Sequence, residues 1–125
     1  MLQNSPVFAY IPVSDLERAR LFYKEKIGLE PSDHNNGGYT YTCADGTAIF
    51  MYVSGGAGTS KASQAFWHVS DIKAEVEELR ARGVVFEEYD FPGMNMVDGI
   101  ATGGGAMAAW FKDSEGNTMA IIQSV

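Results

Sequence analysis

The sequence predicts an α+β fold in which a single domain, residues 1–125, is built from two βαβββ modules. The tetrapeptide Val13-Ser14-Asp15-Leu16 returns as Val69-Ser70-Asp71-Ile72, each copy after a short apolar run and before a charged segment that ends at a glycine. An acid-glycine turn then follows in both halves, at Asp45-Gly46 and at Glu115-Gly116, and leads into a last apolar run. Because these features recur in the same order, we interpret the chain as an internal repeat.

The first module is predicted over residues 1–53 and begins with a strand at 7–13. Ser14 and Glu17 form a capping-box pattern, which predicts the start of a helix. Gly28 can adopt the left-handed conformation that ends this helix. Strands are predicted at 38–43 and 48–53, with one short extra strand at 29–32 and a turn at His34. The helix has an apolar face formed by Leu16, Ala19, Phe22, Tyr23 and Ile27.

The second module is predicted over residues 64–125, after a Gly- and Ser-rich linker at 54–63. Its helix ends at Gly83 and contains Glu78 four residues before Arg82, a spacing that favours an ion pair. Residues 92–105 are predicted as a long irregular loop, and such loops often serve as lids or binding loops. Strands are predicted at 64–69, 84–89, 106–112 and 118–123.

Composition excludes several functional classes. Hydrophobic residues make up 46% and charged residues 20% of the chain, as in ordinary globular domains. A formal net charge of −7 disfavours binding to nucleic acids and to anionic membranes. No apolar run is long enough to span a bilayer, and the N-terminus lacks the basic region of a signal peptide. The single cysteine, Cys43, cannot form an internal disulfide, so we expect a cytoplasmic protein.

Three segments resemble the vicinal oxygen chelate superfamily: IPVSDLERARLFYKEKIGLEP, HVSDIKAEVEELRARGVVFEE and WFKDSEGNTMAIIQ. This superfamily holds glyoxalase I, extradiol dioxygenases and the bleomycin- and fosfomycin-resistance proteins. The resemblance covers nearly the whole chain and implies a curved mixed sheet around a cleft, and a homodimer. Because members of the superfamily differ widely in chemistry, the resemblance predicts the fold much better than the function.

The resemblance also implies where a metal ion would be bound in metal-dependent members, namely in the first and last strands of each module. The motif register maps these positions to Phe8, Phe50, Gln64 and Ala120. A divalent ion needs several imidazole, carboxylate or thiolate ligands, and of these four side chains only Gln64 offers an oxygen. We therefore expect no metal site and no cofactor.

The period of two along each strand predicts which side chains share a face with these four positions. An aromatic face with a few polar tips suits a small amphipathic or aromatic organic ligand, although the same side chains could also fill a closed core. The segment around Met94 and Met96 suits a lid or a subunit contact equally well. The predicted ligand-binding residues are Phe8, Tyr10, Phe50, Tyr52, Gln64, Phe66, His68, Trp110, Tyr89, Met94 and Met96.

Two functional hypotheses follow from these residues. The leading one is a metal-independent protein that binds a small organic molecule, with drug sequestration as one outcome. The alternative is a lyase, isomerase or dioxygenase with a displaced metal site. His68 is a weak candidate for acid–base catalysis, because the sequence shows no partner to orient its ring. A third possibility is an interaction module whose cleft is filled by its own aromatic side chains.

Overall fold

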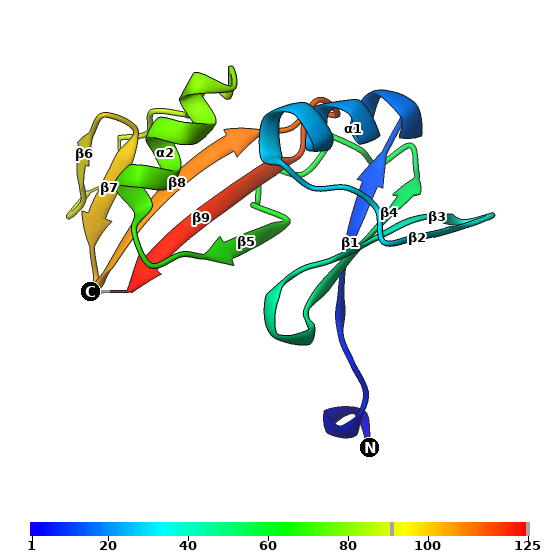
Figure 1. Cartoon of the computed structure of the whole chain (residues 1–125). Helices are drawn as coiled ribbons and strands as arrows, with labels where there is room; N and C mark the ends of the chain where they lie inside the picture. Colours follow the sequence, from blue (N-terminus) through cyan, green and yellow to red (C-terminus); the bar gives the residue numbers. More distant parts are fainter. Residues whose placement is uncertain (91, 125) are drawn as a thin grey trace.

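The computed structural model describes residues 1–90 and 92–124. It confirms the α+β class: one helix packs on each of two mixed sheets, which have four and five strands (Figure 1). The strands are divided between two sheets, one for each of the two predicted modules. β1 (Phe8–Val13) and β5 (Ala65–His68), the first strands of the two halves, are each an edge strand of their own sheet.

The first sheet has the strand order β1-β4-β3-β2, and only the β1–β4 pair is parallel. β3 (Gly38–Thr42) and β4 (Ala48–Val53) confirm two of the predicted strands. The short strand predicted at 29–32 lies instead at β2 (Asp33–Asn35), so the turn prediction for His34 is wrong. Asn35 Oδ1 accepts a hydrogen bond from the Gly37 amide at 2.7 Å, which places the chain reversal after the strand.

α1 (Leu16–Phe22) continues into a π-helical turn, Tyr23–Ile27, and ends at Gly28 with a φ of 82°. The capping-box prediction is wrong in detail. The N-cap is Asp15, whose carboxylate accepts a hydrogen bond from the Arg18 amide at 3.0 Å. The side chain of Ser14 is bound to Glu115 of the second half, and Glu17 instead accepts a hydrogen bond from the hydroxyl of Tyr39.

The second sheet has the strand order β5-β9-β8-β7-β6, and β5 pairs with β9 in parallel. β8 (Ala106–Lys112) and β9 (Thr118–Ser124) lie where strands were predicted. α2 (Ile72–Ala81) is capped by Asp71, and the predicted ion pair between Glu78 and Arg82 is present at 3.6 Å.

The structure corrects two predictions in the second half. Residues 84–89 do not form a strand, and Phe86 makes only an isolated bridge to Phe111. The predicted irregular loop at 92–105 contains two strands, β6 (Asn95–Val97) and β7 (Ile100–Gly103). Both corrections have one cause. β7 pairs with the first half of β8, so residues 84–89 can reach only the remaining half of that strand.

The apolar core lies between each helix and its sheet. In β1 the alternation is clear, because Ile11 and Val13 are fully buried whereas Phe8 and Tyr10 are exposed on the opposite face. None of the described helices has the length and apolar character needed to cross a membrane. The largest fully buried side chains are Tyr23, Tyr41, Phe111, Ile11, Met51, Ile72, Met119, Val13 and Val76.

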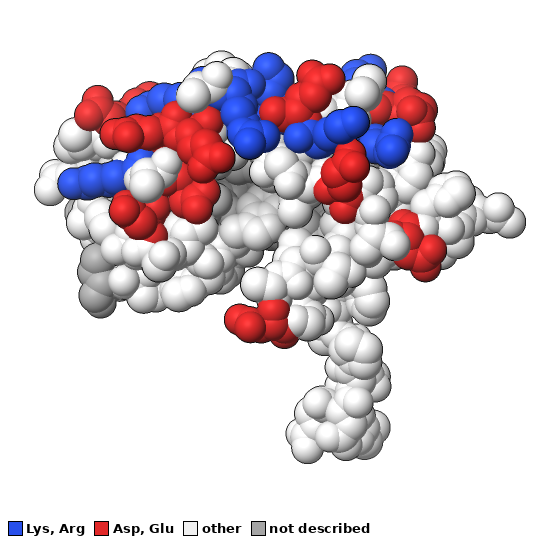
Figure 2. Space-filling model, viewed as in Figure 1, with Lys and Arg blue, Asp and Glu red and all other residues white. Residues whose placement is uncertain are grey.

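Charged side chains are unevenly distributed over the visible surface. Figure 2 shows basic and acidic residues gathered over α1 and α2, whereas the strands below them and the projecting N-terminal segment are nearly free of charge. Exposed apolar side chains are found on the strands of both sheets, among them Phe8, Val53 and Phe66. On the face seen in this view, the charged side chains are therefore concentrated over the two helices.

Candidate functional site

The exposed face of the first sheet carries a preformed aromatic cluster. Tyr10 of β1 stacks on Tyr52 of β4 with ring centroids 3.8 Å apart and an interplanar angle of 21°. The ring of Phe50 lies 6.0 Å from that of Tyr10. Tyr10 remains 61% exposed and Phe8 47% exposed. The strand pairing supports this arrangement, because Tyr10 is paired with Phe50 in the parallel register of β1 and β4, and Tyr52 lies two residues further along β4 on the same face.

The second sheet brings together other predicted residues. Phe66 and His68 share one face of β5, and Phe66 is 57% exposed. His68 Nε2 lies 3.2 Å from Ser124 Oγ on the neighbouring strand β9, a ring partner that sequence reasoning missed. Tyr89 meets Trp110 edge to face with centroids 5.5 Å apart. Burial and the nearby Glu87 carboxylate raise the pKa of Tyr89.

The remaining predicted residues lie apart from these two clusters. The amide of Gln64 donates a hydrogen bond to the carbonyl of Ala62 at 3.1 Å. Met96 lies in the edge strand β6, opposite Ala101 of β7, and Met94 immediately precedes that strand. The two methionines therefore belong to a hairpin at the edge of the second sheet rather than to an irregular loop, and their roles as lid or subunit contact stay predictions.

The four positions at which the superfamily would hold a metal ion do not fit one. Phe8 and Phe50 present only rings, and Ala120 is a buried methyl group. Gln64 offers a single amide, which is no substitute for the several ionised or imidazole ligands that such a site needs. Within residues 1–90 and 92–124, no group of three or more His, Cys, Asp or Glu side chains is placed to hold a metal ion.

A buried carboxylate joins the two halves of the chain. Glu115, in the turn between β8 and β9, accepts hydrogen bonds from the Ser14 and Asp15 amides at 3.0 and 2.9 Å. Its other oxygen pairs with Arg18 Nε at 2.9 Å, and the glutamate side chain is fully buried. Burial opposes ionisation, but the hydrogen bonds from Arg18, Ser114 and the start of α1 outweigh it and lower the pKa of Glu115 to about 2.

The same turn makes further polar contacts with the first half. The hydroxyl of Tyr23 donates to Asp113 Oδ2 at 2.7 Å, and the Asn117 amide donates to the carbonyl of Pro12 at 2.7 Å. Burial raises the pKa of Asp113 and, more strongly, that of Tyr23. The sequence of residues 113–117 indicates only a hairpin turn, because nothing local shows that the turn contacts the start of α1.

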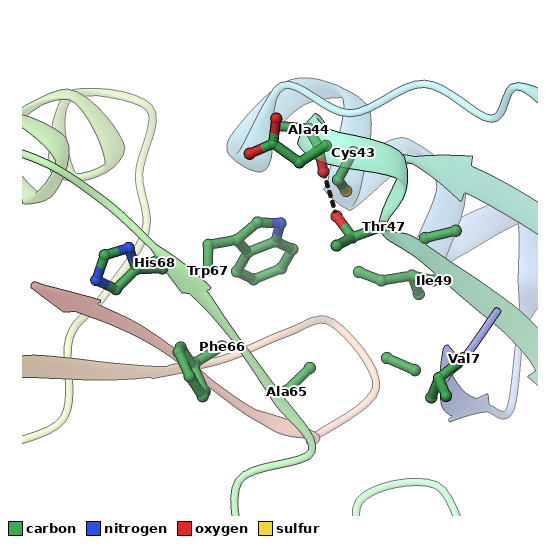
Figure 3. A pocket seen from close by; sticks show the side chains of 12 residues that line it. Val7, Cys43, Ala44, Thr47, Ile49, Ala65, Phe66, Trp67 and His68 are labelled. Carbon is green, nitrogen blue, oxygen red and sulfur yellow. Dashed lines mark hydrogen bonds between the residues drawn. The ribbon is translucent and has the colours of Figure 1, made fainter. Parts of the chain in front are cut away.

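A pocket of about 420 Å³ lies between the two halves, beside β5 (Figure 3). Figure 3 shows the indole of Trp67 between β5 and the turn that contains Cys43 and Thr47, while Phe66 points to the other side of the strand. Of the predicted ligand-binding residues, this pocket contains only Phe66 and His68. The full lining is Val7, Ala9, Cys43, Ala44, Asp45, Thr47, Ala48, Ile49, Ala65, Phe66, Trp67 and His68.

Comparison with known proteins assigns the family. The model of the Glyoxalase/Bleomycin resistance protein/Dioxygenase superfamily matches residues 6–121. The chain belongs to this superfamily. The resemblance found in the sequence is thereby confirmed, although no curated protein sequence matches the chain. Because the superfamily includes both enzymes and non-enzymatic binding proteins, membership does not by itself decide between them.

Three solved structures share the fold of this chain. UcmS2 is 20% identical, with a TM-score of 0.71 over 93% of this chain and 96% of that one. TnmS3, an antibiotic binding protein from Streptomyces sp. CB03234, is 21% identical, with a TM-score of 0.70 over 100% and 99%. A glyoxalase/bleomycin resistance protein from Catenulispora acidiphila DSM 44928 is 16% identical, with a TM-score of 0.69 over 96% and 98%.

Proposed function

We propose that this superfamily member is a metal-independent binding protein that holds a small, partly aromatic organic molecule against the exposed face of its first sheet, with drug sequestration as the outcome. The observation that supports this proposal most directly is the stacked pair of Tyr10 and Tyr52, which keeps one tyrosine ring largely open to solvent. Rings held in place by strand pairing lose little conformational freedom when a flat ligand packs on them.

The chemistry of the face supports binding rather than catalysis. Its side chains provide apolar area and phenol hydroxyls, which can position a ligand by stacking and hydrogen bonding. The structural neighbour TnmS3 is described as an antibiotic binding protein, which favours the same kind of function here. His68, the weak catalytic candidate, contacts a serine hydroxyl rather than a carboxylate that would stabilise its protonated ring.

We further propose that the protein acts in the cytoplasm as a homodimer. Val97 is exposed in β6, the edge strand of the second sheet, away from the Tyr10–Tyr52 pair, and a second copy packed along that edge would bury it. Multi-angle light scattering on the purified protein tests this directly. A mass of one chain of 13.6 kDa across the micromolar range would contradict the dimer.

Equilibrium dialysis with two probes tests the binding function. Phenazine, a neutral planar molecule, and metal-free bleomycin would each be measured against the parent protein and the Tyr10→Ala variant. We expect at least one probe to bind saturably. Tyr10→Ala should weaken that binding about five- to tenfold, because removing a stacking partner costs roughly 1–1.4 kcal/mol.

Leu21→Ala provides a matched control, since Leu21 is an exposed apolar residue of α1, on the helical side of the molecule. This variant should bind the probe as the parent does. Equal weakening by both substitutions, or equal binding by the parent and Tyr10→Ala, would show that the aromatic face is not the site. Turnover of a probe would favour the enzyme hypothesis instead.

A further inference from the structure

The two halves of the chain meet at two positions that the internal repeat makes equivalent. In the closed junction, the turn Asp113–Asn117 lies against the end of β1 and the start of α1. In the open junction, the equivalent turn Cys43–Thr47 faces β5 across the pocket of about 420 Å³ (Figure 3). In each junction a turn of one half therefore faces the other half. Side chains fill the space at the closed junction, whereas a pocket remains at the open junction.

Long polar side chains fill the closed junction. The guanidinium of Arg18 donates to Glu115 from Nε and Nη2, both at 2.9 Å, and Asn117 reaches the backbone of β1. At this junction a cation and a carboxylate of the chain itself occupy the space between the turn and the neighbouring element. The pair forms a charge-assisted contact with two donors.

Shorter side chains stand at the equivalent positions of the open junction. The repeat register places Asp45 where the closed junction has Glu115, and Thr47 where it has Asn117. It also places Ala74 in the position of Arg18, and no Lys or Arg is among the described residues that line the pocket. Within the part of the chain that the structure describes, no ion pair involves Asp45.

The pocket that remains combines one carboxylate with an aromatic wall. Trp67 is half-buried and held in place by stacking on Phe111, with centroids 6.4 Å apart. Ala9, Ile49 and Ala65 make the neighbouring surface small and apolar. An indole face and a carboxylate both attract organic cations, and the net charge of −7 raises the local concentration of such ligands.

We propose that the open junction is a second binding site, for a small organic cation with a planar apolar body. The body packs on Trp67, and the amidinium or ammonium group pairs with Asp45, as Arg18 pairs with Glu115 in the closed junction. This site is separate from the aromatic pair of the proposed function, because neither Tyr10 nor Tyr52 lines the pocket. Either proposal can therefore fail without the other.

Benzamidine is a suitable probe, and benzamide is its neutral counterpart of nearly the same shape. Each would be titrated into ¹⁵N-labelled protein while the indole N–H signal of Trp67 and the backbone amides of residues 45–47 are followed. Trp67→Phe assigns the indole signal, since the chain has 2 tryptophans. We expect benzamidine to shift these signals saturably and benzamide to bind roughly tenfold more weakly, because it forms no charge-assisted bond.

Asp45→Asn removes the charge without straining the backbone, because Asn tolerates the φ of 58° found at this position. This variant should lose about tenfold in benzamidine affinity. Asp98→Asn is the matched control: Asp98 has a φ of 52°, and it lies outside this pocket. It should bind as the parent does.

Three results would overturn the proposal. One is equal affinity for benzamidine and benzamide, and another is unchanged affinity in Asp45→Asn. The third is the absence of any saturable shift of the Trp67 signal at millimolar benzamidine.

Discussion

The phenol of Tyr23 in the first half of the chain donates a hydrogen bond of 2.7 Å to the carboxylate of Asp113 in the second half, and both groups are buried. α1 continues into the π-helical turn that begins at Tyr23, and the Tyr23 side chain of this turn contacts the second module. The bond therefore stabilises the docking of the two halves rather than either half alone. A buried acceptor that loses its donor is costly, which makes this contact a sensitive test of the interface.

Tyr23→Phe should lower the free energy of unfolding by about 1–3 kcal/mol, since it leaves an Asp113 oxygen with fewer donors in a buried place. Urea unfolding followed by circular dichroism measures the change. Tyr39→Phe is the control, because its hydroxyl also bonds to a carboxylate, Glu17, but at the surface. A loss in Tyr39→Phe as large as that in Tyr23→Phe would contradict the importance of burial.

Glu115→Gln should also lower the free energy of unfolding by about 1–3 kcal/mol. The substitution removes the buried negative charge that pairs with Arg18, and the new NH2 group would face a donor instead of accepting a hydrogen bond from it. The comparison is Glu78→Gln, which breaks the exposed ion pair with Arg82 and should change stability by less than about 0.5 kcal/mol. Both are measured by urea unfolding at neutral pH. Similar small effects in both variants would mean that the buried carboxylate contributes little.

Acid should destabilise the protein through Glu115. The folded-state pKa of Glu115 is about 2, below its ordinary value of 4.5, so its contribution is present above pH 4.5 and is lost as the pH falls towards 2. The contribution of Asp113 to stability depends on pH in the opposite direction. Burial raises the pKa of Asp113, so its contribution favours the folded state at low pH and is lost as the pH rises. We expect Glu115→Gln to flatten the fall in stability between pH 4.5 and 2. An equally steep fall in that variant would show that other carboxylates cause it.

Gly38→Ala should destabilise the first sheet. A Cβ at Gly38 would meet the backbone carbonyl of Met51 in β4, and the φ of 150° also disfavours an L side chain. We expect a loss of about 1–3 kcal/mol in the free energy of unfolding. Gly55→Ala, where a Cβ meets open space, is the control and should lie within about 0.5 kcal/mol of the parent.

Metal analysis tests the expected absence of a metal site. The purified protein would be incubated with Fe(II), Mn(II), Ni(II) or Zn(II), desalted and measured by plasma mass spectrometry. We expect near-zero metal per chain, because Phe8, Phe50 and Ala120 provide no ligand atom. About one tightly held ion per chain would mean that the metal-ligand register is wrong, and the enzyme hypothesis would then lead.

The sequence predicts most of the fold because the repeat and the strand alternation are local signals. β8 and β9 were found in this way, and so was the alternation of β1. The strand prediction at 84–89 was wrong for a non-local reason. This segment contains residues that favour strands, but β7 already pairs with the first half of β8, the strand that the segment would pair with. β6 and β7 were missed because both strands are very short and the Asp98-Gly99 turn that joins them was not recognised as a hairpin signal.

The candidate site also has a part that local sequence signals predict and a part that depends on contacts between distant residues. Strand periodicity places Tyr10 beside Tyr52 on one face, and the structure adds the 3.8 Å stacking between them. The role of Glu115 could not be predicted, since a hairpin turn gives no indication of which distant helix its carboxylate will contact. The open junction was equally inaccessible, because it depends on the relative placement of the two halves.

The contact between Ser14 and Glu115 joins residues 101 positions apart, which matters for synthesis on the ribosome. The first half of the chain emerges long before Glu115 is added. The amides of Ser14 and Asp15, just before α1, therefore have no Glu115 acceptor until translation is almost complete. Contacts of such sequence separation form late and slow folding. The nascent first module is therefore an incomplete structure that becomes fully stable only when the last strands of the chain arrive.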